Sequence, residues 1–233
     1  MRPIEVPTSK AKLKLLSSAE SLVALRGFDA VSVRDVTQKA KANVAAINYH
    51  FGSRKGMMDL LMLLRMSPIH EEQLSNLNLL EKKRGSKAVP VEELLEAWLK
   101  PMFLGGKEAK KTEDVALRSV ARILQVSVAE LPEALSLSGA ELWKRYLKAF
   151  GKTLKDFPAQ EIAWRLHLIN GSAVQSLIGT EPIHEWAGVD NASSSIEQRL
   201  SRLLLLAAPM MREGGVKVEE ESKPKGPQST FDF

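Results

Sequence analysis

Residues 32–55, SVRDVTQKAKANVAAINYHFGSRK, decide the fold of this chain. Ser32 followed three residues later by Asp35 predicts a capping box, in which the two side chains bond each other's backbone at the start of a helix. After a short turn, Asn43 is suited to cap a second helix, and Gly52 ends it. Two short helices joined by a turn of about three or four residues have the spacing of a helix-turn-helix.

The outward face of the second of these helices carries no charged side chain. Small or hydrogen-bonding side chains fill this face: Val44, Ala45, Ala46, Asn48, Tyr49 and His50. A helix that enters the major groove of DNA needs short side chains, apolar contacts for thymine methyl groups and an amide that bonds adenine. We therefore expect Asn43 and this face to bind DNA, with Tyr49, His50, Arg54 and Lys55 as phosphate partners. A solvated helical hairpin tolerates the same small residues and is the alternative.

The stretch resembles the DNA-binding domain of the TetR family of bacterial regulators. The likeness rests on Gly27-Phe28, then SVRDVTQKA, then NYHFGSRK, which follow one another in the family's order within residues 11–64. It implies an all-α protein, with an N-terminal three-helix helix-turn-helix domain followed by a larger helical domain for ligand binding and dimerisation. It also implies that Arg34 and Arg54 hold phosphates from helices on either side of the recognition helix.

The chain departs from the family pattern in two places. Lys41 stands where the turn usually carries glycine, so we expect it to adopt a left-handed conformation at a cost of about 1 kcal/mol. Lys55 replaces a usual acid, and Gly56 follows where a better helix former is common. A cation in the first turn opposes the helix dipole. Either an external anion, such as a DNA phosphate, compensates Lys55, or it is a surface residue of little cost.

Charge and composition fit an intracellular nucleic-acid-binding protein. Residues 1–56 carry ten Lys and Arg against four Asp and Glu, whereas residues 57–233 carry 23 against 24. The excess positive charge thus lies where phosphates would bind. The absence of cysteine excludes a disulfide framework and thiolate chemistry. The longest uncharged apolar run, residues 203–211, is shorter than the roughly 20 residues of a membrane helix, so we expect a cytoplasmic protein outside membranes.

The chain divides into four parts by composition and periodicity. We expect a flexible arm over 1–10, the helix-turn-helix domain over 11–56, a helical domain over 57–212 and a disordered tail over 213–233. No stretch alternates with the period of a strand. Pro68 should kink or end the helix that begins near Met57. A clean apolar stripe marks one long helix: Leu142, Tyr146, Phe150 and Leu154.

The last two predicted helices are apolar on more than one side. The run LLLLAAPMM, within residues 196–211, covers most of a helix circumference, and residues 163–177 have a second apolar side. Such helices are buried all round, which a second copy of the chain most simply provides. The penultimate helix resembles that of TetR-type proteins, where it pairs with the last helix in a dimeric four-helix bundle. The predicted homodimer interface comprises Leu168, Val174, Leu203 and Leu204.

Catalytic motifs and metal-ligand spacings are absent from the sequence, so we expect no enzyme, metal or cofactor. A ligand pocket follows only from the resemblance, which implies a small molecule among the middle helices. The residues placed to line it are Trp98, Met102, Phe103, Trp143 and His167. Aromatic and Met side chains at helical spacing also form ordinary core. Arg118 and Arg122, one turn apart, would favour an anionic ligand if they faced the pocket.

These features predict a homodimeric, sequence-specific transcriptional regulator that binds a palindromic DNA operator. We expect a repressor that a small-molecule effector releases by favouring a dimer whose recognition helices no longer match the groove spacing. A ligand-independent regulator or activator of the same fold is the alternative, and a helical enzyme or adaptor is a more distant one. The sequence does not identify the effector, the operator or the regulated genes.

Overall fold

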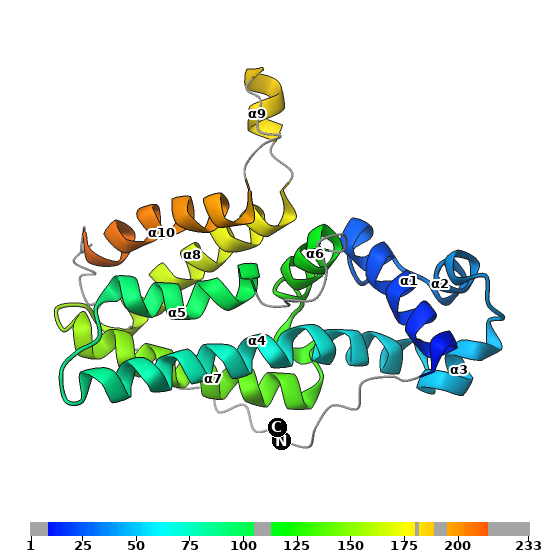
Figure 1. Ribbon diagram of the computed structural model, residues 1–233, viewed down its shortest axis with the longest axis horizontal. Helices are drawn as coiled ribbons and strands as arrows, with labels where there is room; N and C mark the ends of the chain where they lie inside the picture. The colour runs from blue at the N-terminus through cyan, green and yellow to red at the C-terminus, as the bar shows by residue number, and fades with distance from the viewer. Residues whose placement is uncertain (1–8, 105–112, 180–181, 189–194, 214–233) are drawn as a thin grey trace, which may run out of the picture.

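The chain folds into helices joined by short connections (Figure 1). The structure, a computed structural model, describes residues 9–104, 113–179, 182–188 and 195–213. The elements are α1 (Lys10–Arg26), α2 (Val33–Ala40), α3 (Ala45–Phe51), α4 (Arg54–Arg84), α5 (Val91–Leu104), α6 (Glu113–Ile123), the short η1 (Val128–Glu130), α7 (Glu133–Thr153), α8 (Ala159–Ile178), α9 (Pro182–Ala187) and α10 (Ile196–Arg212). None of these ranges contains a strand, which confirms the all-α prediction. The predicted arm and tail fall largely outside the described residues.

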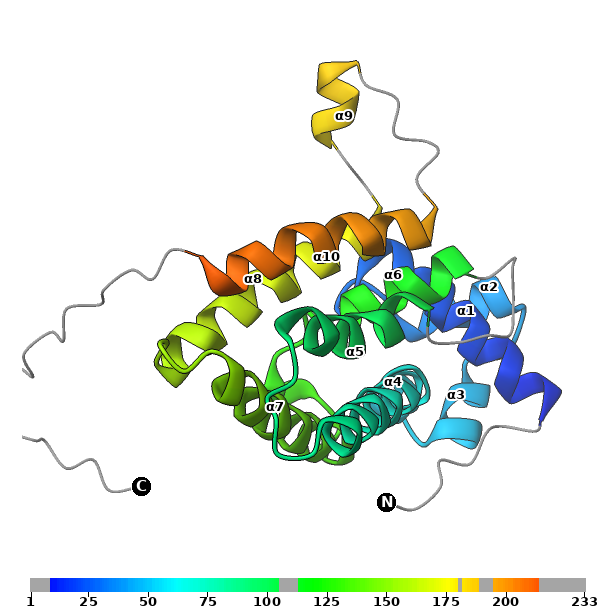
Figure 2. The same ribbon diagram turned by 60° about the vertical axis from the view of Figure 1, so that its left-hand side comes forward.

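The helices form a small N-terminal domain and a larger bundle. Helices α1 to α3 gather around the first turns of α4 at one end of the molecule, and α4 continues through the bundle to the other end (Figures 1 and 2). Its 31 residues span roughly 46 Å at 1.5 Å per residue. Helices α5 and α7 flank it, while α8 and α10 lie side by side on one outer face.

The N-terminal domain has its own hydrophobic core. Leu15, Ala19 and Leu22 of α1 are buried, and they meet residues from α2, α3 and α4. An ion pair links α1 to α4: Arg65 donates a guanidinium hydrogen bond of 2.7 Å to Glu20, which is nearly buried. The position of α1 on α4 is therefore fixed by apolar packing and by one charge pair.

The larger domain is built around aromatic side chains. Trp98 of α5 packs edge-on against Trp143 of α7, with ring centroids 5.0 Å apart. Tyr146 donates a hydrogen bond of 3.0 Å to the carbonyl of Gln73, whose side chain donates one of 2.7 Å to the carbonyl of Trp98. The predicted stripe on α7 is buried, including Phe150. These bonds join α4, α5 and α7 into one unit.

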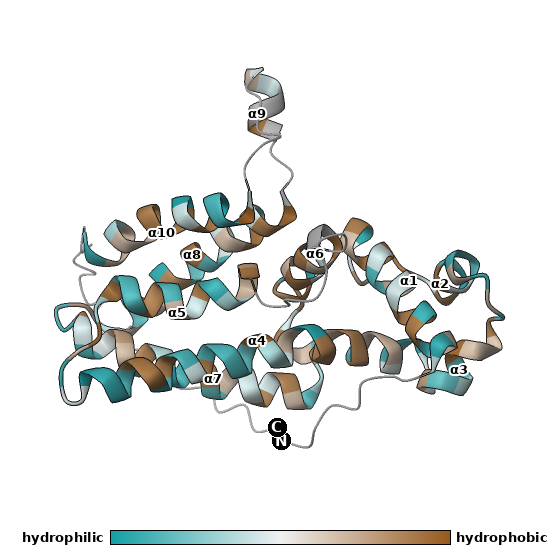
Figure 3. Cartoon of the chain, viewed as in Figure 1, coloured by the Kyte–Doolittle hydropathy of each residue, from teal (hydrophilic) through white to brown (hydrophobic). Residues whose placement is uncertain are grey.

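Helix α4 does not end at Pro68, and in this respect the expectation of an end there is wrong. Proline costs about 3 kcal/mol inside a helix because it cannot donate to the preceding turn. Here Pro68 lies on the exposed side, whereas its neighbours Met66 and Ile69 are buried in the larger core. Figure 3 shows that the first half of α4, which crosses from one domain to the other, is mainly hydrophobic. Packing of these turns holds the helix through the proline.

A partly buried histidine on α4, His70, makes the stability of the fold depend on pH. Nδ1 of His70 lies 2.9 Å from Oγ of Ser138, which itself donates to the carbonyl of Leu135. Burial lowers the pKa of His70 to about 4, so the ring is neutral at neutral pH. In the unfolded chain the pKa is about 6.5, so the unfolded state binds more protons between these values.

We expect the free energy of unfolding to fall by roughly 2–3 kcal/mol as the pH drops from 7 to 4 on account of His70 alone. The contribution is fully present above pH 6.5 and is lost by pH 4. Urea titrations of the wild type and of His70→Gln across this range measure it as the difference between the two pH profiles. Parallel profiles would contradict the assignment.

Candidate nucleic-acid interface

The capping box at the start of α2 is present as predicted. The backbone N–H of Ser32 donates to Oδ2 of Asp35 at 2.9 Å, and the backbone N–H of Asp35 donates to Oγ of Ser32 at 3.2 Å. The hydrogen bonds from Ser32, with Arg26 nearby, hold the pKa of the Asp35 carboxyl below its ordinary value. Val36 and Ala40 are buried against the domain core. The opposite face of α2, including Arg34, is left exposed.

The turn between α2 and α3 also follows the sequence prediction. Lys41 adopts the left-handed conformation, with φ 50° and ψ 51°, and it is the sole non-glycine residue with positive φ in the described ranges. Asn43 accepts a hydrogen bond of 2.9 Å from the backbone N–H of Ala45, and so caps α3. These two residues set the angle at which α3 leaves α2.

Replacing Lys41 with glycine is expected to raise the free energy of unfolding by about 1 kcal/mol, because glycine has no Cβ to clash in this conformation. Lys39→Gly, an exposed change inside α2, is the matched control and should lower stability by about 1 kcal/mol. Urea denaturation measures both. A loss of stability in Lys41→Gly would show that its side chain contributes more than its backbone strain costs.

Helix α3 presents the predicted face to solvent. Ile47 is fully buried, and Lys12 of α1 lies 5.4 Å above the ring of Phe51, so one side of α3 is fixed to the domain. The remaining predicted residues are exposed or half-buried, and of these Ala46 packs partly against the domain core: Asn43, Val44, Ala45, Ala46, Asn48, Tyr49 and His50. Tyr49 is 86% exposed and Val44 50%, although apolar burial would favour covering both. This surface is available to a partner.

Arg54 has a different role from the one expected by resemblance. Its Nε donates a hydrogen bond of 2.8 Å to the carbonyl of Val31, and a terminal nitrogen donates to the carbonyl of Phe28. These carbonyls belong to the connection between α1 and α2, where no helical partner is available. The structure thus corrects the phosphate assignment, because Arg54 is directed into the protein and holds the two helices together.

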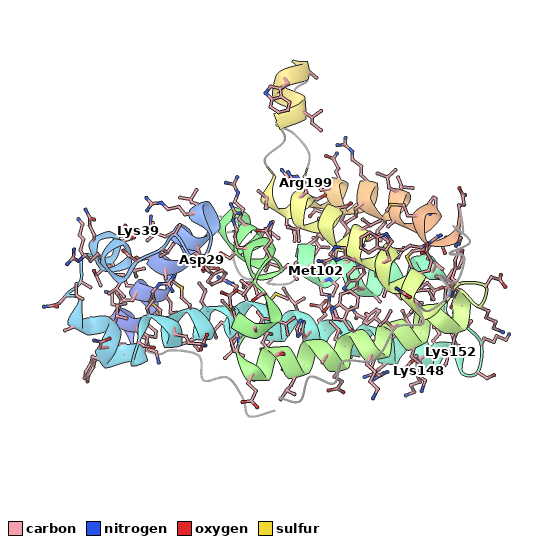
Figure 4. The ribbon with its side chains drawn as sticks, turned by 180° about the vertical axis from the view of Figure 1, so that it is seen from behind. Asp29, Lys39, Met102, Lys148, Lys152 and Arg199 are labelled. Carbon is pink, nitrogen blue, oxygen red and sulfur yellow. The ribbon has the colours of Figure 1, made fainter. Side chains whose placement is uncertain are left out.

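Lys55 finds its counter-charge within the chain. Its Nζ donates to both carboxylate oxygens of Asp59, at 2.7 and 2.9 Å, one turn further along α4. The pair offsets the unfavourable position of a cation in the first turn, so no external anion is required. Two cations outside the predicted set are exposed, Lys39 in the last turn of α2 and Lys41 in the turn that follows it. Figure 4 places Lys39 at the N-terminal-domain end of the molecule. The sequence feature that could have indicated them is the positive charge in and just before the turn between α2 and α3.

The residues expected to line a ligand pocket do not all come together. Trp98, Met102 and Phe103 of α5 are buried in the larger core, and Trp143 is half-buried against Trp98 (Figure 4 labels Met102). His167 is exposed on α8, where its ring stacks on Trp164 at 5.5 Å. Its assignment to an interior pocket is wrong, because it follows the outer side of the helix.

A cleft lies where the N-terminal domain meets the end of α6 and the residues that follow it. It measures about 420 Å³, and its lining includes Phe28, Met58, Arg122 and Val126. Arg122 therefore faces the junction of the two domains rather than the aromatic core around Trp98.

The predicted dimer interface is corrected in part. Val174 and Leu203 are buried within their own chain, each 7% exposed, and Leu204 is half-buried against the same core. Leu168 is exposed as expected, and so are other apolar residues of the second side of α8 and of the LLLLAAPMM run on α10. The exposed apolar residues there are Trp164, Leu168, Leu205, Leu206 and Met210. When apolar residues occupy most of the circumference of a helix, the sequence does not show which of them pack inside their own domain and which remain exposed.

No helix in the described part of the chain is long and apolar enough to cross a membrane. Within the same residues, no group of three or more acidic or histidine side chains is placed to hold a metal ion.

Solved structures share the fold. A bacterial regulatory protein of the tetR family from Rhodococcus RHA1 superimposes with a TM-score of 0.55 at 16% identity, covering 88% of this chain and 98% of the other. The TetR family regulator PfmR from Thermus thermophilus gives 0.52 at 14% identity, covering 84% and 96%. The fatty acid degradation regulator FadR from Bacillus halodurans gives 0.50 at 15% identity, covering 91% and 99%. At these identities the likeness concerns the fold.

Two families match by sequence. The family described as bacterial regulatory proteins, tetR family, matches residues 15–61, which include α2, α3 and the beginning of α4. The family described as tetracyclin repressor-like, C-terminal domain, matches residues 96–209. Comparison with curated proteins gave no match. With both of its domains matched in order, the chain belongs to the TetR family of DNA-binding transcriptional regulators, which are transcription factors and not enzymes.

Proposed function

We propose that the protein is a homodimeric repressor that binds a palindromic operator and is released from it by a small molecule. The outward face of α3 carries the proposal, because it combines short apolar residues, the amide of Asn48 and the highly exposed Tyr49. A dimer bound across a promoter would exclude RNA polymerase. Its two recognition helices would enter successive major grooves about 34 Å apart.

The outer face of α8 and α10 supports dimerisation. Five large apolar side chains are exposed there on adjacent helices, and contiguous apolar surface of this kind marks protein interfaces. We propose that the same face of a second copy covers it, with Leu168, Leu205 and Leu206 near its centre. The arrangement is isologous, since the same patch serves both subunits.

The connections between the domains suggest how a ligand would act. Helix α4 begins directly after α3 and runs into the larger core, and α6 packs against α1. A ligand beside Trp98, Met102, Phe103 and Trp143 that shifts these helices would move α3 as well. We propose an apolar or amphipathic effector, because these side chains offer aromatic and thioether surface. A ligand-independent regulator is the alternative, and a compound screen for coupled changes in thermal stability and operator affinity separates the two.

Three substitutions test the groove assignment. Asn48→Ala should weaken operator binding by about 1–3 kcal/mol, relax the preference at one base pair per half-site and leave the salt dependence unchanged. Arg34→Ala should weaken binding to all sequences and lower the salt slope by about two, one phosphate per subunit. Arg54→Ala should instead reduce the stability of the N-terminal domain, since its guanidinium is bonded to Val31 and Phe28.

Fluorescence anisotropy on upstream DNA and on random duplex, at several salt concentrations, measures all three. Urea denaturation of the same variants separates binding from folding. If Asn48→Ala and Arg34→Ala both left DNA affinity unchanged, α3 would not be the recognition helix.

A further inference from the structure

An apolar arm interrupts the two helices that form the proposed dimer face. Helix α9 lies between α8 and α10 in the chain and stands clear of the rest of the molecule (Figures 1 and 2). Ile183 and Trp186, three residues apart, share one side of this helix. They are 73% and 83% exposed, and neither belongs to a hydrophobic core.

The base of this arm is firmly attached to the bundle. Gly179 ends α8 in the left-handed conformation, and its N–H donates to the carbonyl of Gln175. Arg199 of α10 donates a hydrogen bond of 3.2 Å to the carbonyl of Ser176, so the end of α8 is tied to the start of α10 (Figure 4 labels Arg199). A capping box between Ser195 and Gln198 starts α10. The place from which the arm projects is thus fixed.

Among the residues that the structure describes, none covers the apolar side of α9. An isolated helix shorter than about 12 residues is marginal in water, and α9 has six. Tryptophan and isoleucine side chains gain most of their stabilisation from burial, which the described part of the chain does not supply here. A surface that covers Ile183 and Trp186 would order the helix and remove both side chains from water.

The direction of the arm identifies that surface. Figures 1 and 2 show α9 projecting beyond α8 and α10, away from α5 and α4. The exposed apolar side chains of α8 and α10 are likewise those turned away from the core that these helices cover. A second copy docked on this face therefore lies alongside the arm. Both recognition helices must reach the same duplex, so the two N-terminal domains share one end of the dimer. The arm leaves α8 and α10 at the end nearer that domain (Figure 1).

We propose, on the basis of the homodimer proposed above, that α9 clasps the partner subunit through Ile183 and Trp186. Because each arm engages the partner at the end nearer the DNA, the pair of clasps sets the separation of the two recognition helices. The arm is then a determinant of half-site spacing as well as of dimer stability. By two-fold symmetry, each subunit both gives and receives one arm.

Crosslinking tests the contact directly. The chain contains no cysteine, so Trp186→Cys carries a single benzophenone label. Leu137→Cys, 65% exposed on α7, carries the same label as the matched control. Benzophenone-bearing chains of natural isotope content and chains enriched in ¹⁵N are mixed to form dimers and then irradiated. Sedimentation of the same sample reports the oligomeric state. We expect crosslinks between light and heavy chains from position 186 alone.

The possible outcomes are distinct. A monomer in sedimentation contradicts the homodimer and with it the clasp. A stable dimer whose label at 186 reacts only within its own chain, or not at all, overturns the clasp and leaves the homodimer standing. Capture of another macromolecule in place of the partner, when operator DNA or cell extract is added, also overturns it.

Half-site spacing gives an independent measure. In the double variant Ile183→Ser/Trp186→Ser we expect the dimer dissociation constant to rise by about 100-fold, since two apolar side chains per subunit lose their cover. At protein concentrations that keep the variant dimeric, operators with one or two base pairs inserted between the half-sites should bind nearly as well as the native operator. The wild type should reject these insertions. Equal discrimination by both proteins contradicts the role in spacing.

Discussion

Replacing Leu206 with arginine will give a monomer that binds the operator at least about 100-fold more weakly than the wild type. Leu206 is 67% exposed on α10, within the apolar face shared with α8. In a dimer the new charge would be buried without a partner, at a cost of several kcal/mol, whereas in the monomer it is solvated. A monomer presents one recognition helix and loses the second half-site.

Light scattering and anisotropy on the operator measure the two effects of Leu206→Arg. Leu79→Arg is the control, because Leu79 is 63% exposed on α4, outside that face, and its replacement should change neither property. Leu204→Arg should behave differently from both, since Leu204 packs against the core and its loss would unfold the chain. A Leu206→Arg protein that remained dimeric would place the interface elsewhere.

The second large effect is expected at Arg165 of α8. Among the described residues of the larger bundle, it is the only charged residue that is buried. Its guanidinium donates to Glu161 at 2.7 Å and to the carbonyls of Met210 and Glu213 at 2.8 and 2.9 Å. It also lies 4.3 Å above the ring of Phe157. One side chain of α8 thereby caps the C-terminal end of α10.

Arg165→Met should lower the free energy of unfolding by about 3–5 kcal/mol, because Glu161 and two carbonyls lose their donor. The melting temperature should fall by roughly 10 °C. Arg212→Met serves as the control: its partner Glu92 is about half exposed, and exposed pairs contribute less than about 1 kcal/mol.

The double variant Arg165→Met/Glu161→Met separates charge from capping. It should recover part of the loss, since no uncompensated carboxylate remains. Urea denaturation of the three variants provides the comparison. A cost below about 1 kcal/mol for Arg165→Met would mean that water replaces the guanidinium without penalty.

Structural features that depend only on residues close together in the sequence could be predicted. The capping box of Ser32 and Asp35, the left-handed Lys41 and the Asn43 cap each depend on residues within one turn, so local chemistry determines them. The outward face of α3 followed in the same way, because Ile47 fixes which side is buried.

Features that depend on distant residues were not predictable. Arg54 bonds carbonyls 23 and 26 residues away, and nothing near it in sequence shows this. Val174 and Leu203 have the same apolar character as Leu205, so the sequence could not assign them to the core or to the dimer face. His167 lies one residue from buried Leu166, and the sequence did not show on which side of α8 it falls. The arm formed by α9 lacks a periodic signal because it is only six residues long.

Helix α4 contributes to the hydrophobic cores of both domains. Met57, Met58 and Leu61 complete the core of the N-terminal domain, while Met62 and Met66, within the next turns, belong to the larger core. Fraying of α4 in either domain therefore exposes apolar side chains of the other. The protein should unfold as one cooperative unit. A fragment that stops after the helix-turn-helix would lack the residues of α4 against which the recognition helix α3 packs.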